Sequence, residues 1–330
     1  MKFAKVLATV AGTAALALTL AACSAPAATP ADGGTDAGST DALQIGLIML
    51  QGDTYFQGIQ TGLEEAVKAD GGTVTTGLSN NDPAQENQVA QSMIQKQVDA
   101  VLIQPTADEA SLATMKAIKD AGIALICYGN CIGATADPAN VDGVIQSDNT
   151  ALGTGTGEFA ASFIKENIGD SVKLAILNCD IASACKLRKA GFLESLEGAG
   201  ITVDVVTDQE AYLTDKATPV AENILTANPD VDIFWASNDG GTAGAVIGTK
   251  GSGKPVFGTD ISTQIAEFII DPEGSLQATT GQDPVGTAQG AYEMAKKVIA
   301  GETLEQHSVE LPGITYDRAN PETAEAFLAQ

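Results

Sequence analysis

The first half of the chain alternates short apolar runs with longer stretches whose apolar residues recur on one helical face. Four runs have the length and continuity of buried strands, at residues 43–50, 73–78, 100–103 and 123–127. Between the first two, Ile59, Leu63, Ala66 and Val67 repeat at intervals that place them on one side of a helix. Continuous apolar strands separated by helices predict a parallel sheet covered on both faces.

The same alternation restarts at Val172. Strands are expected at 172–177, 201–206, 231–236 and 256–257, and helices at 186–197, 216–226, 240–248 and 263–270. Two pairs of segments also echo each other at nearly constant offset: 62–74 with 191–201, and 98–104 with 231–237. The sequence therefore predicts two similar Rossmann-like α/β lobes, in keeping with a chain of 330 residues.

The N-terminal segment predicts export. Lys2 and Lys5 precede an uncharged apolar stretch at 6–20, whose helical length of about 22 Å is too short for a bilayer core of about 30 Å. Residues 1–22 are therefore expected to form a signal peptide. Leu20-Ala21-Ala22-Cys23 resembles the lipobox of bacterial lipoproteins, which implies cleavage before Cys23 and lipidation of that cysteine. Residues 24–41 contain only Ser, Ala, Pro, Thr, Asp and Gly and predict a flexible tether.

The charge balance excludes one class of partner. The chain carries 17 basic and 42 acidic residues, a net charge of −25, and loss of Lys2 and Lys5 with the signal peptide makes it more negative. Such a surface repels polyanions, so we expect no binding to nucleic acid.

Four cysteines remain beside Cys23, and they are Cys127, Cys131, Cys179 and Cys185. An even number in an exported protein favours disulfides, and the sequence-local pairing, 127 with 131 and 179 with 185, is one of three that are possible. A four-cysteine zinc site is an alternative, although neither spacing is the usual C-x2-C. Free thiols are the third possibility.

Residues for catalysis are sparse. His307 is the only histidine, which excludes histidine-based triads and metal sites. The glycine-rich turn at 248–254 departs from a P-loop at Pro255, and the one at 153–157 lacks the third glycine of a dinucleotide fingerprint. We therefore expect no enzyme, no cofactor and no metal. A hydrolase built on Asp53 and Asp260 is the alternative that the sequence leaves open.

Ligands of open α/β sheets bind outside the carboxyl ends of the strands, so the residues that follow each strand are the candidates. They combine aromatic rings with amides, carboxylates and two basic groups, and they are Asp53, Tyr55, Phe56, Gln104, Tyr128, Lys186, Arg188, Tyr212, Asn238, Asp260 and Gln282. Aromatic faces cover the C–H surface of a sugar, and amides and carboxylates pair with its hydroxyls. This set predicts a site for a sugar or polyol.

Six different short motifs follow one another along about 230 residues of the chain. They are Tyr55-Phe56, Ile103-Gln104-Pro105-Thr106-Ala107-Asp108, Gln146-Ser147-Asp148-Asn149, Ala236-Ser237-Asn238-Asp239, Phe257-Gly258-Thr259-Asp260 and Gly281-Gln282-Asp283-Pro284. With them the chain resembles the ribose-type family of periplasmic sugar-binding proteins.

The resemblance implies the type I periplasmic-binding-protein fold, with ligand closing a cleft between two lobes. Three crossovers are implied, near 147–149, 282–284 and 303–307. They divide the chain into an N-terminal lobe of 42–147 plus 283–305 and a C-terminal lobe of 148–282 plus 306–330. The resemblance also assigns roles. The ring-sandwiching aromatics are Tyr55, Phe56 and Tyr212, and the polar contacts are Asp53, Gln104, Lys186, Asn238, Asp260 and Gln282.

Two departures put ribose itself in question. Many relatives carry Asp-Arg where this chain has Tyr128-Gly129, and an arginine where it has Lys186, with Arg188 two residues later. A hexose, another pentose or an acyclic polyol is equally open.

The expected function is therefore that of a monomeric receptor, lipid-anchored to the outer face of the cell membrane or in the periplasm. It would deliver a neutral monosaccharide or polyol to an ABC transporter permease. The alternative is a receptor that presents a small molecule to a membrane signalling protein.

Overall fold

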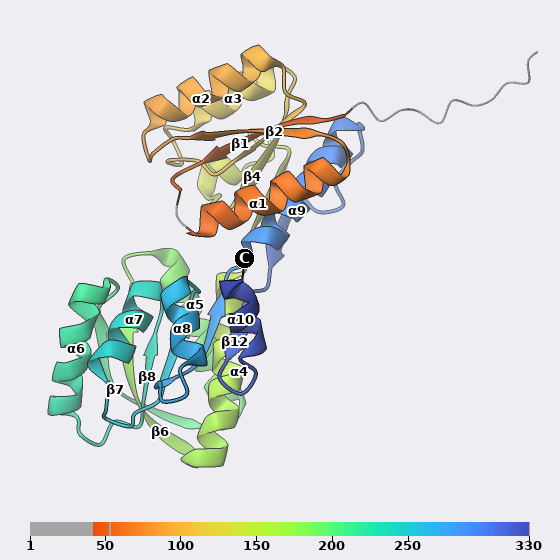
Figure 1. The fold of residues 1–330 in the computed structure, drawn as a ribbon. Helices are drawn as coiled ribbons and strands as arrows, with labels where there is room; N and C mark the ends of the chain where they lie inside the picture. Colours follow the sequence, from red (N-terminus) through yellow and green to blue (C-terminus); the bar gives the residue numbers. More distant parts are fainter. Residues whose placement is uncertain (1–41, 53, 330) are drawn as a thin grey trace, which may run out of the picture. The chain divides into compact units, whose positions relative to one another are not determined.

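The computed structural model describes residues 42–52 and 54–329 (Figure 1). The expected signal peptide, the lipidation site Cys23, the tether at 24–41 and the candidate residue Asp53 lie outside the described residues. Within the described part, no helix is both long and apolar enough to cross a membrane.

The first lobe is a parallel sheet of six strands in the order β11-β5-β4-β3-β1-β2. Its strands are β1 (Gln44–Met49), β2 (Thr73–Leu78), β3 (Ala100–Ile103), β4 (Ala124–Tyr128), β5 (Gly143–Ser147) and β11 (Ser308–Leu311). Its helices are α1 (Thr54–Ala69), α2 (Pro83–Lys96), α3 (Leu112–Asp120) and α9 (Pro284–Ile299), with a 3-10 turn at Gly133–Ala136. In Figure 1, α1 and α9 cover one face of the sheet, and α2 and α3 cover the other.

Side chains of successive strand residues point to opposite faces of the sheet and pack in two separate hydrophobic cores of this lobe. Leu47 of β1 packs in the cluster shared with α1 and α9, whereas the next residue, Ile48, packs in the cluster shared with α2 and α3. Both side chains are fully buried. The continuous apolar strands predicted from the sequence are therefore explained by burial on both faces.

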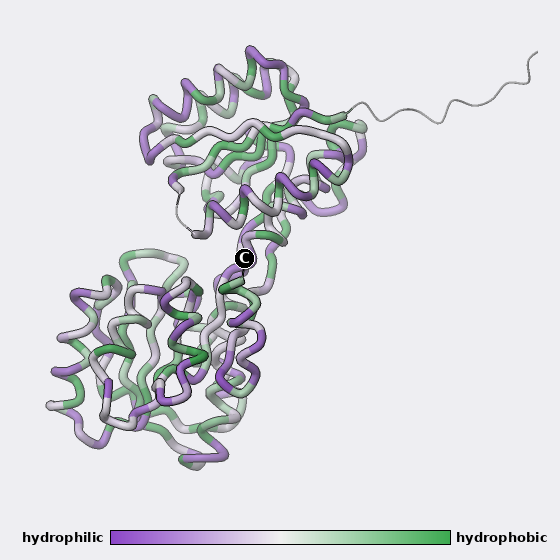
Figure 2. The backbone as a smooth tube through the Cα atoms, in the orientation of Figure 1, coloured by the Kyte–Doolittle hydropathy of each residue, from purple (hydrophilic) through white to green (hydrophobic). Residues whose placement is uncertain are grey.

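The second lobe repeats this plan with the strand order β12-β10-β9-β8-β6-β7. Its strands are β6 (Ser171–Asn178), β7 (Thr202–Glu210), β8 (Ile233–Ala236), β9 (Val256–Thr259), β10 (Leu276–Gly281) and β12 (Ile314–Asp317). Its helices are α4 (Asn149–Asn167), α5 (Ser183–Gly198), α6 (Thr214–Ala227), α7 (Asp239–Gly248), α8 (Thr263–Ile270) and α10 (Glu322–Leu328). All strand pairs are parallel except β10 with β12. Figure 2 shows the hydrophobic residues gathered along the strands of both sheets, with hydrophilic residues on the outer sides of the helices.

The chain passes between the two sheets after β5, after β10 and after β11. The third crossing lies after Leu311 and not at the predicted boundary of 305/306. The reason is that Ser308–Leu311 pairs with β5 and therefore belongs to the first lobe. This edge strand alternates polar with apolar residues and gives no continuous apolar run, which explains why the sequence pattern missed it. With parallel strands, the carboxyl ends of each sheet lie at a single edge, where the candidate residues gather.

Candidate functional site

A cavity of about 300 Å³ is lined by residues from both lobes. Its described lining residues are Thr54, Tyr55, Asp239, Asp260, Ile261, Ser262, Gln282, Pro284 and Phe327. Tyr55, Asp260 and Gln282 are therefore the predicted site residues that the structure brings into one cavity. Its volume is at the lower end of the range for small-molecule sites.

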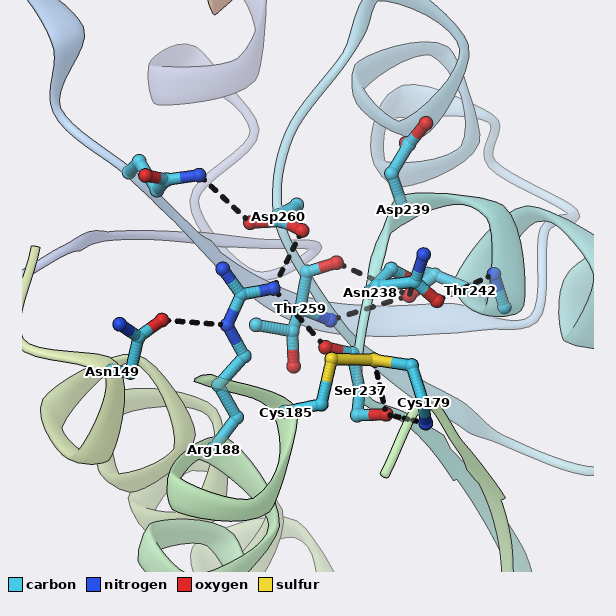
Figure 3. Close-up of polar contacts among 12 residues, drawn as sticks. Asn149, Cys179, Cys185, Arg188, Ser237, Asn238, Asp239, Thr242, Thr259 and Asp260 are labelled. Carbon is cyan, nitrogen blue, oxygen red and sulfur yellow. Dashed lines mark hydrogen bonds and ion pairs between the residues drawn. A yellow bond between two sulfur atoms is a disulfide. The ribbon is translucent and has the colours of Figure 1, made fainter. Parts of the chain in front are cut away.

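Arg188 and Asp260 form the ion pair at the centre of the polar cluster drawn in Figure 3. The Arg188 Nη1 atom donates to Asp260 Oδ2 at 2.7 Å and to the backbone oxygen of Ser237 at 3.2 Å. Its Nε atom donates to Asn149 Oδ1 at 3.0 Å. The two charged side chains are only 8% and 19% exposed, so each depends on the other for its counter-charge.

Close helix packing sets the position of Arg188. A Cβ atom on Gly153 of α4 would overlap the backbone oxygen of Arg188, and one on Gly191 of α5 would overlap the backbone oxygen of Thr150. The glycines let the two helix backbones touch. The glycine motif at 153–157, which resembled part of a nucleotide-binding turn, thus serves helix packing in this fold.

Asp260 follows β9 in the left-handed backbone region, at a φ of +72°, which is uncommon for a residue other than glycine. Its N–H donates to the Thr280 oxygen at 3.0 Å, and the Thr279 hydroxyl donates to its backbone oxygen at 2.7 Å. These bonds tie the turn to the neighbouring strand β10. Strained backbone of this kind concentrates at ligand sites.

Gln282 connects Asp260 to the crossing segments. Its Nε2 atom lies 3.5 Å from Asp260 Oδ1, a long hydrogen bond, and its Oε1 atom accepts from the Ser147 hydroxyl at 3.1 Å. Ser147 ends β5 and Gln282 follows β10, so both residues stand where the chain passes between the sheets. The polar cluster therefore includes two of the three crossovers.

Asn238 and Asp239 begin α7. Asn238 caps the helix, because its Oδ1 atom accepts from the Gly241 N–H at 3.1 Å while its Nδ2 atom donates to the Tyr212 oxygen at 3.0 Å. Its amide is thus engaged at both ends within the protein. Asp239 accepts from the Ser262 hydroxyl at 2.8 Å. Burial raises the pKa of Asp239, the negative charge of Asp260 raises it further, and the bond from Ser262 opposes them.

In the first lobe, Tyr55 lines the cavity, whereas Phe56 is 4% exposed and packs in the core with an edge-to-face contact to Tyr55. Gln104 is buried beside Gly129, where a Cβ atom would overlap Gln104 Oε1 and lie 3.4 Å from the Tyr55 hydroxyl. Gly129, at a φ of +78°, therefore makes room for the Gln104 side chain. Here the departure from the Asp-Arg pattern of the family has a steric role.

Three further predicted contacts also lie outside the cavity lining. Tyr128, an expected ligand contact, is fully buried in the first lobe, and its hydroxyl donates to the Ile48 oxygen at 3.0 Å. Lys186 is exposed on the first turn of α5, outside the cavity lining. Tyr212 is half-buried and is likewise outside that lining.

The other lining residues were not among the predicted site residues, and they are Thr54, Asp239, Ile261, Ser262, Pro284 and Phe327. Asp239 adjoins the predicted Asn238, and Ile261 and Ser262 adjoin Asp260, so a wider window around each strand end would have included them. Phe327 follows no strand end of the parallel sheets, and no signal in the pattern marks it.

Of the three possible pairings, the cysteines form the sequence-local one. Cys127 is bonded to Cys131 and Cys179 to Cys185, with Cα atoms 6.1 Å and 5.5 Å apart. The second disulfide joins the end of β6 to the start of α5, and the Cys179 N–H donates to the Ser237 hydroxyl at 3.0 Å (Figure 3). It therefore fixes the turn that leads to Arg188.

Comparisons with known proteins agree with this architecture. A family model described as a periplasmic binding protein domain matches residues 45–303. The ABC transporter periplasmic-binding protein YphF of Escherichia coli (strain K12) is 29% identical over 233 residues, 69% of this chain and 71% of its own. The ribose import binding protein RbsB of Bacillus subtilis (strain 168) is 29% identical over 277 residues, 82% of this chain and 87% of its own.

Among solved structures, a solute binding protein of an ABC transporter from Actinobacillus succinogenes 130z with bound D-allose aligns with a TM-score of 0.70. It is 25% identical, and the alignment covers 85% of this chain and 99% of that one.

Proposed function

This chain belongs to the ribose-type family of periplasmic sugar-binding proteins, and from that premise we propose that it captures a neutral monosaccharide or polyol in the cavity around Asp260. The relatives are solute-binding proteins of ABC transporters and not enzymes, and the family is extracytoplasmic. In the proposed function the ligand is then delivered to an ABC transporter permease.

One observation carries the proposal: the cavity combines Asp260 and Gln282 from the strand ends of the second lobe with Tyr55 from the first. The carboxylate and the amide offer acceptors and donors for adjacent hydroxyls, and the aromatic ring offers cover for the C–H face of a sugar. Ribose in RbsB and D-allose in the solved relative are ligands of this chemical class. Because Tyr128-Gly129 replaces the Asp-Arg of many relatives, the proposal does not single out ribose.

A thermal-shift screen tests this function. A ligand that binds only the folded state stabilises it by about 2.7 kcal/mol at a concentration of 100 Kd, so its presence raises the melting temperature. We expect at least one of D-ribose, D-allose, myo-inositol and the common aldohexoses to raise the Tm of the purified protein. The absence of any shift across the panel at saturating concentrations would contradict the proposal.

We also propose that the protein is anchored through lipid on Cys23, which supports a role beside a membrane permease. The support is the lipobox at the end of a short apolar segment. Mass spectrometry of the protein isolated from its native host should find a mature chain that begins at a lipid-modified Cys23. An N-terminus elsewhere, or an unmodified cysteine, would refute the anchor without affecting the sugar site.

A further inference from the structure

Each lobe contributes one aromatic side chain to the described lining of the cavity, but the one from the second lobe is not the predicted Tyr212. Tyr55 lines it from α1, as expected, whereas Tyr212 is not among the described lining residues. The aromatic residue that the second lobe contributes is Phe327 of the C-terminal helix α10. Residues 304–330 lie beyond the segment that the family model matches, so this contribution comes from a part of the chain that the family pattern does not cover.

Packing holds Phe327 at the cavity. Ala324, one turn earlier in α10, is fully buried in the core formed with α6, α7 and α8. The Phe327 ring meets the ring of Tyr316 edge to face, with centroids 6.0 Å apart and planes at 74°, and Tyr316 is only 5% exposed. One side of the Phe327 ring is therefore fixed against the lobe, while the side chain as a whole remains partly exposed.

The neighbours of Phe327 in the cavity lining complete a surface of mixed chemistry. Ile261 adds apolar surface, and Asp239 and Ser262 add a carboxylate and a hydroxyl that are hydrogen-bonded to each other at 2.8 Å. An aromatic ring flanked by hydrogen-bonding groups suits one face of a sugar or cyclic polyol: C–H groups lie against the ring, and hydroxyls meet the polar edge.

We propose that Phe327 is a specificity-determining residue, whose ring contacts the C–H surface of the bound sugar or polyol. This inference rests on the proposed function, because it assigns a further contact to the same cavity. The ring favours ligands that present an uninterrupted C–H face to the second lobe over ligands that present an axial hydroxyl there. Asp239 and Ser262 accept hydrogen bonds from ligand hydroxyls at the edge of that face, because the Ser262 proton is already donated to Asp239.

Calorimetric titration of D-ribose, D-allose and myo-inositol into the full-length protein and its variants tests the proposal. For the probe that binds wild type most tightly, Phe327→Ala should weaken binding by about 5- to 30-fold, which is about 1–2 kcal/mol at 1.4 kcal/mol per decade. Phe327→Leu, which keeps apolar bulk and loses the ring, should recover only part of the affinity. Affinity ratios among the three probes should also change, because the ring contacts each ligand differently.

Phe268→Ala is the matched control. Phe268 of α8 is also a partly buried phenylalanine packed on the same core, but it lines a separate cavity. It should leave every affinity within about twofold of wild type, and circular dichroism should show that all variants are folded.

The possible results distinguish a failure of the proposed role of Phe327 from a failure of the proposed sugar-binding function. If wild type binds a probe and Phe327→Ala binds it equally well, the inference is wrong and the proposed function stands. If Phe268→Ala weakens binding as much as Phe327→Ala does, or Phe327→Ala lowers all affinities by one factor, Phe327 acts through the stability of the lobe and the inference is wrong. If wild type binds none of the probes, a thermal-shift screen that is also negative contradicts the proposed function, and the inference falls with it.

Discussion

At the scale of single residues, the Asp260 carboxylate serves two purposes. Its Oδ2 atom neutralises Arg188, and its Oδ1 atom faces Gln282 at the cavity. A polar residue in an empty, solvent-filled cleft would be expected to contribute little to the stability of the fold. The structure corrects this expectation, since removing the carboxylate would leave a mostly buried guanidinium without its counter-charge.

We therefore expect Asp260→Ala to lower the free energy of unfolding by about 3 kcal/mol, the order found when one partner of a buried ion pair is removed. Asp260→Asn also removes the counter-charge but keeps an oxygen that can accept from Arg188 Nη1, so it should cost less, about 2 kcal/mol. Urea unfolding followed by circular dichroism measures both values. Equal stability of wild type and Asp260→Ala would mean that the ion pair contributes nothing to the fold.

The pH dependence of stability tests the surroundings of Asp239. Burial raises its pKa above the ordinary value of 3.8, so the protonated form is favoured in the folded state and the ionised form destabilises it. This cost is fully present above the folded-state pKa and disappears as the pH falls through 3.8, where both states are protonated. Asp239→Asn should therefore raise the Tm at pH 7, with a gain that shrinks towards pH 4.

Scanning calorimetry across this pH range provides the measurement. A lower Tm for Asp239→Asn at pH 7 would contradict the expectation. It would mean that the charged bond to Ser262 and the position at the start of α7 outweigh the cost of burial.

At the scale of elements, the Cys179–Cys185 disulfide closes the turn between β6 and α5 that precedes Arg188. Replacing both cysteines by serine should lower the free energy of unfolding by about 2 kcal/mol, the loop-entropy value for so short a loop. Sugar affinity should fall as well, because the start of α5 loses its covalent link to Cys179.

Treating wild type with a reductant is the matched control for this variant. Reduced wild type and the double serine variant should agree in stability and affinity, apart from any contribution of the Cys127–Cys131 bond, which the reductant also breaks. A double variant as stable as the oxidised protein would show that the disulfide constrains nothing of importance.

The elements that the sequence predicted well are those buried on both faces. All four residues of β3, and all four of β8, are buried, and their apolar runs identify them directly. The sequence pattern did not reveal β5, β10, β11 and β12, because glycine, threonine, glutamine and charged residues interrupt their apolar positions. The chain crosses to the other lobe after three of these strands, β5, β10 and β11. The boundary after β11 was placed wrongly because β11 was not recognised as a strand of the first lobe.

The candidate site was predictable only in part, for a related reason. Position after a strand end identifies Tyr55, Asp260 and Gln282, but it does not say whether a side chain turns towards the cavity or the core. Tyr128 turns inward because its hydroxyl reaches the Ile48 oxygen on a nearby strand. Phe327 lies at the cavity because α10 packs on the second lobe. This packing is a tertiary contact, which the hydrophobic pattern of the sequence around Phe327 does not predict.

At the scale of the whole molecule, two α/β lobes share three crossovers, and one cavity draws its lining from both. The polar cluster that begins at Arg188 ends at Ser147 and Gln282, at two of those crossovers. A ligand held by Asp260 and Gln282 would thus contact the segments about which the lobes of such receptors move. In the proposed function a sugar or polyol binds at this point.

Isothermal titration calorimetry of wild type and Asp260→Asn with the same sugar or polyol tests that claim most directly. Wild type should bind one ligand per chain with a Kd of about 1 μM, equivalent to about −8 kcal/mol. Asp260→Asn should bind it about 5- to 10-fold more weakly, because a hydrogen bond to a charged acceptor contributes about 1–1.5 kcal/mol more than one to the neutral amide that replaces it. Binding of that ligand by folded Asp260→Asn at wild-type strength would contradict the account.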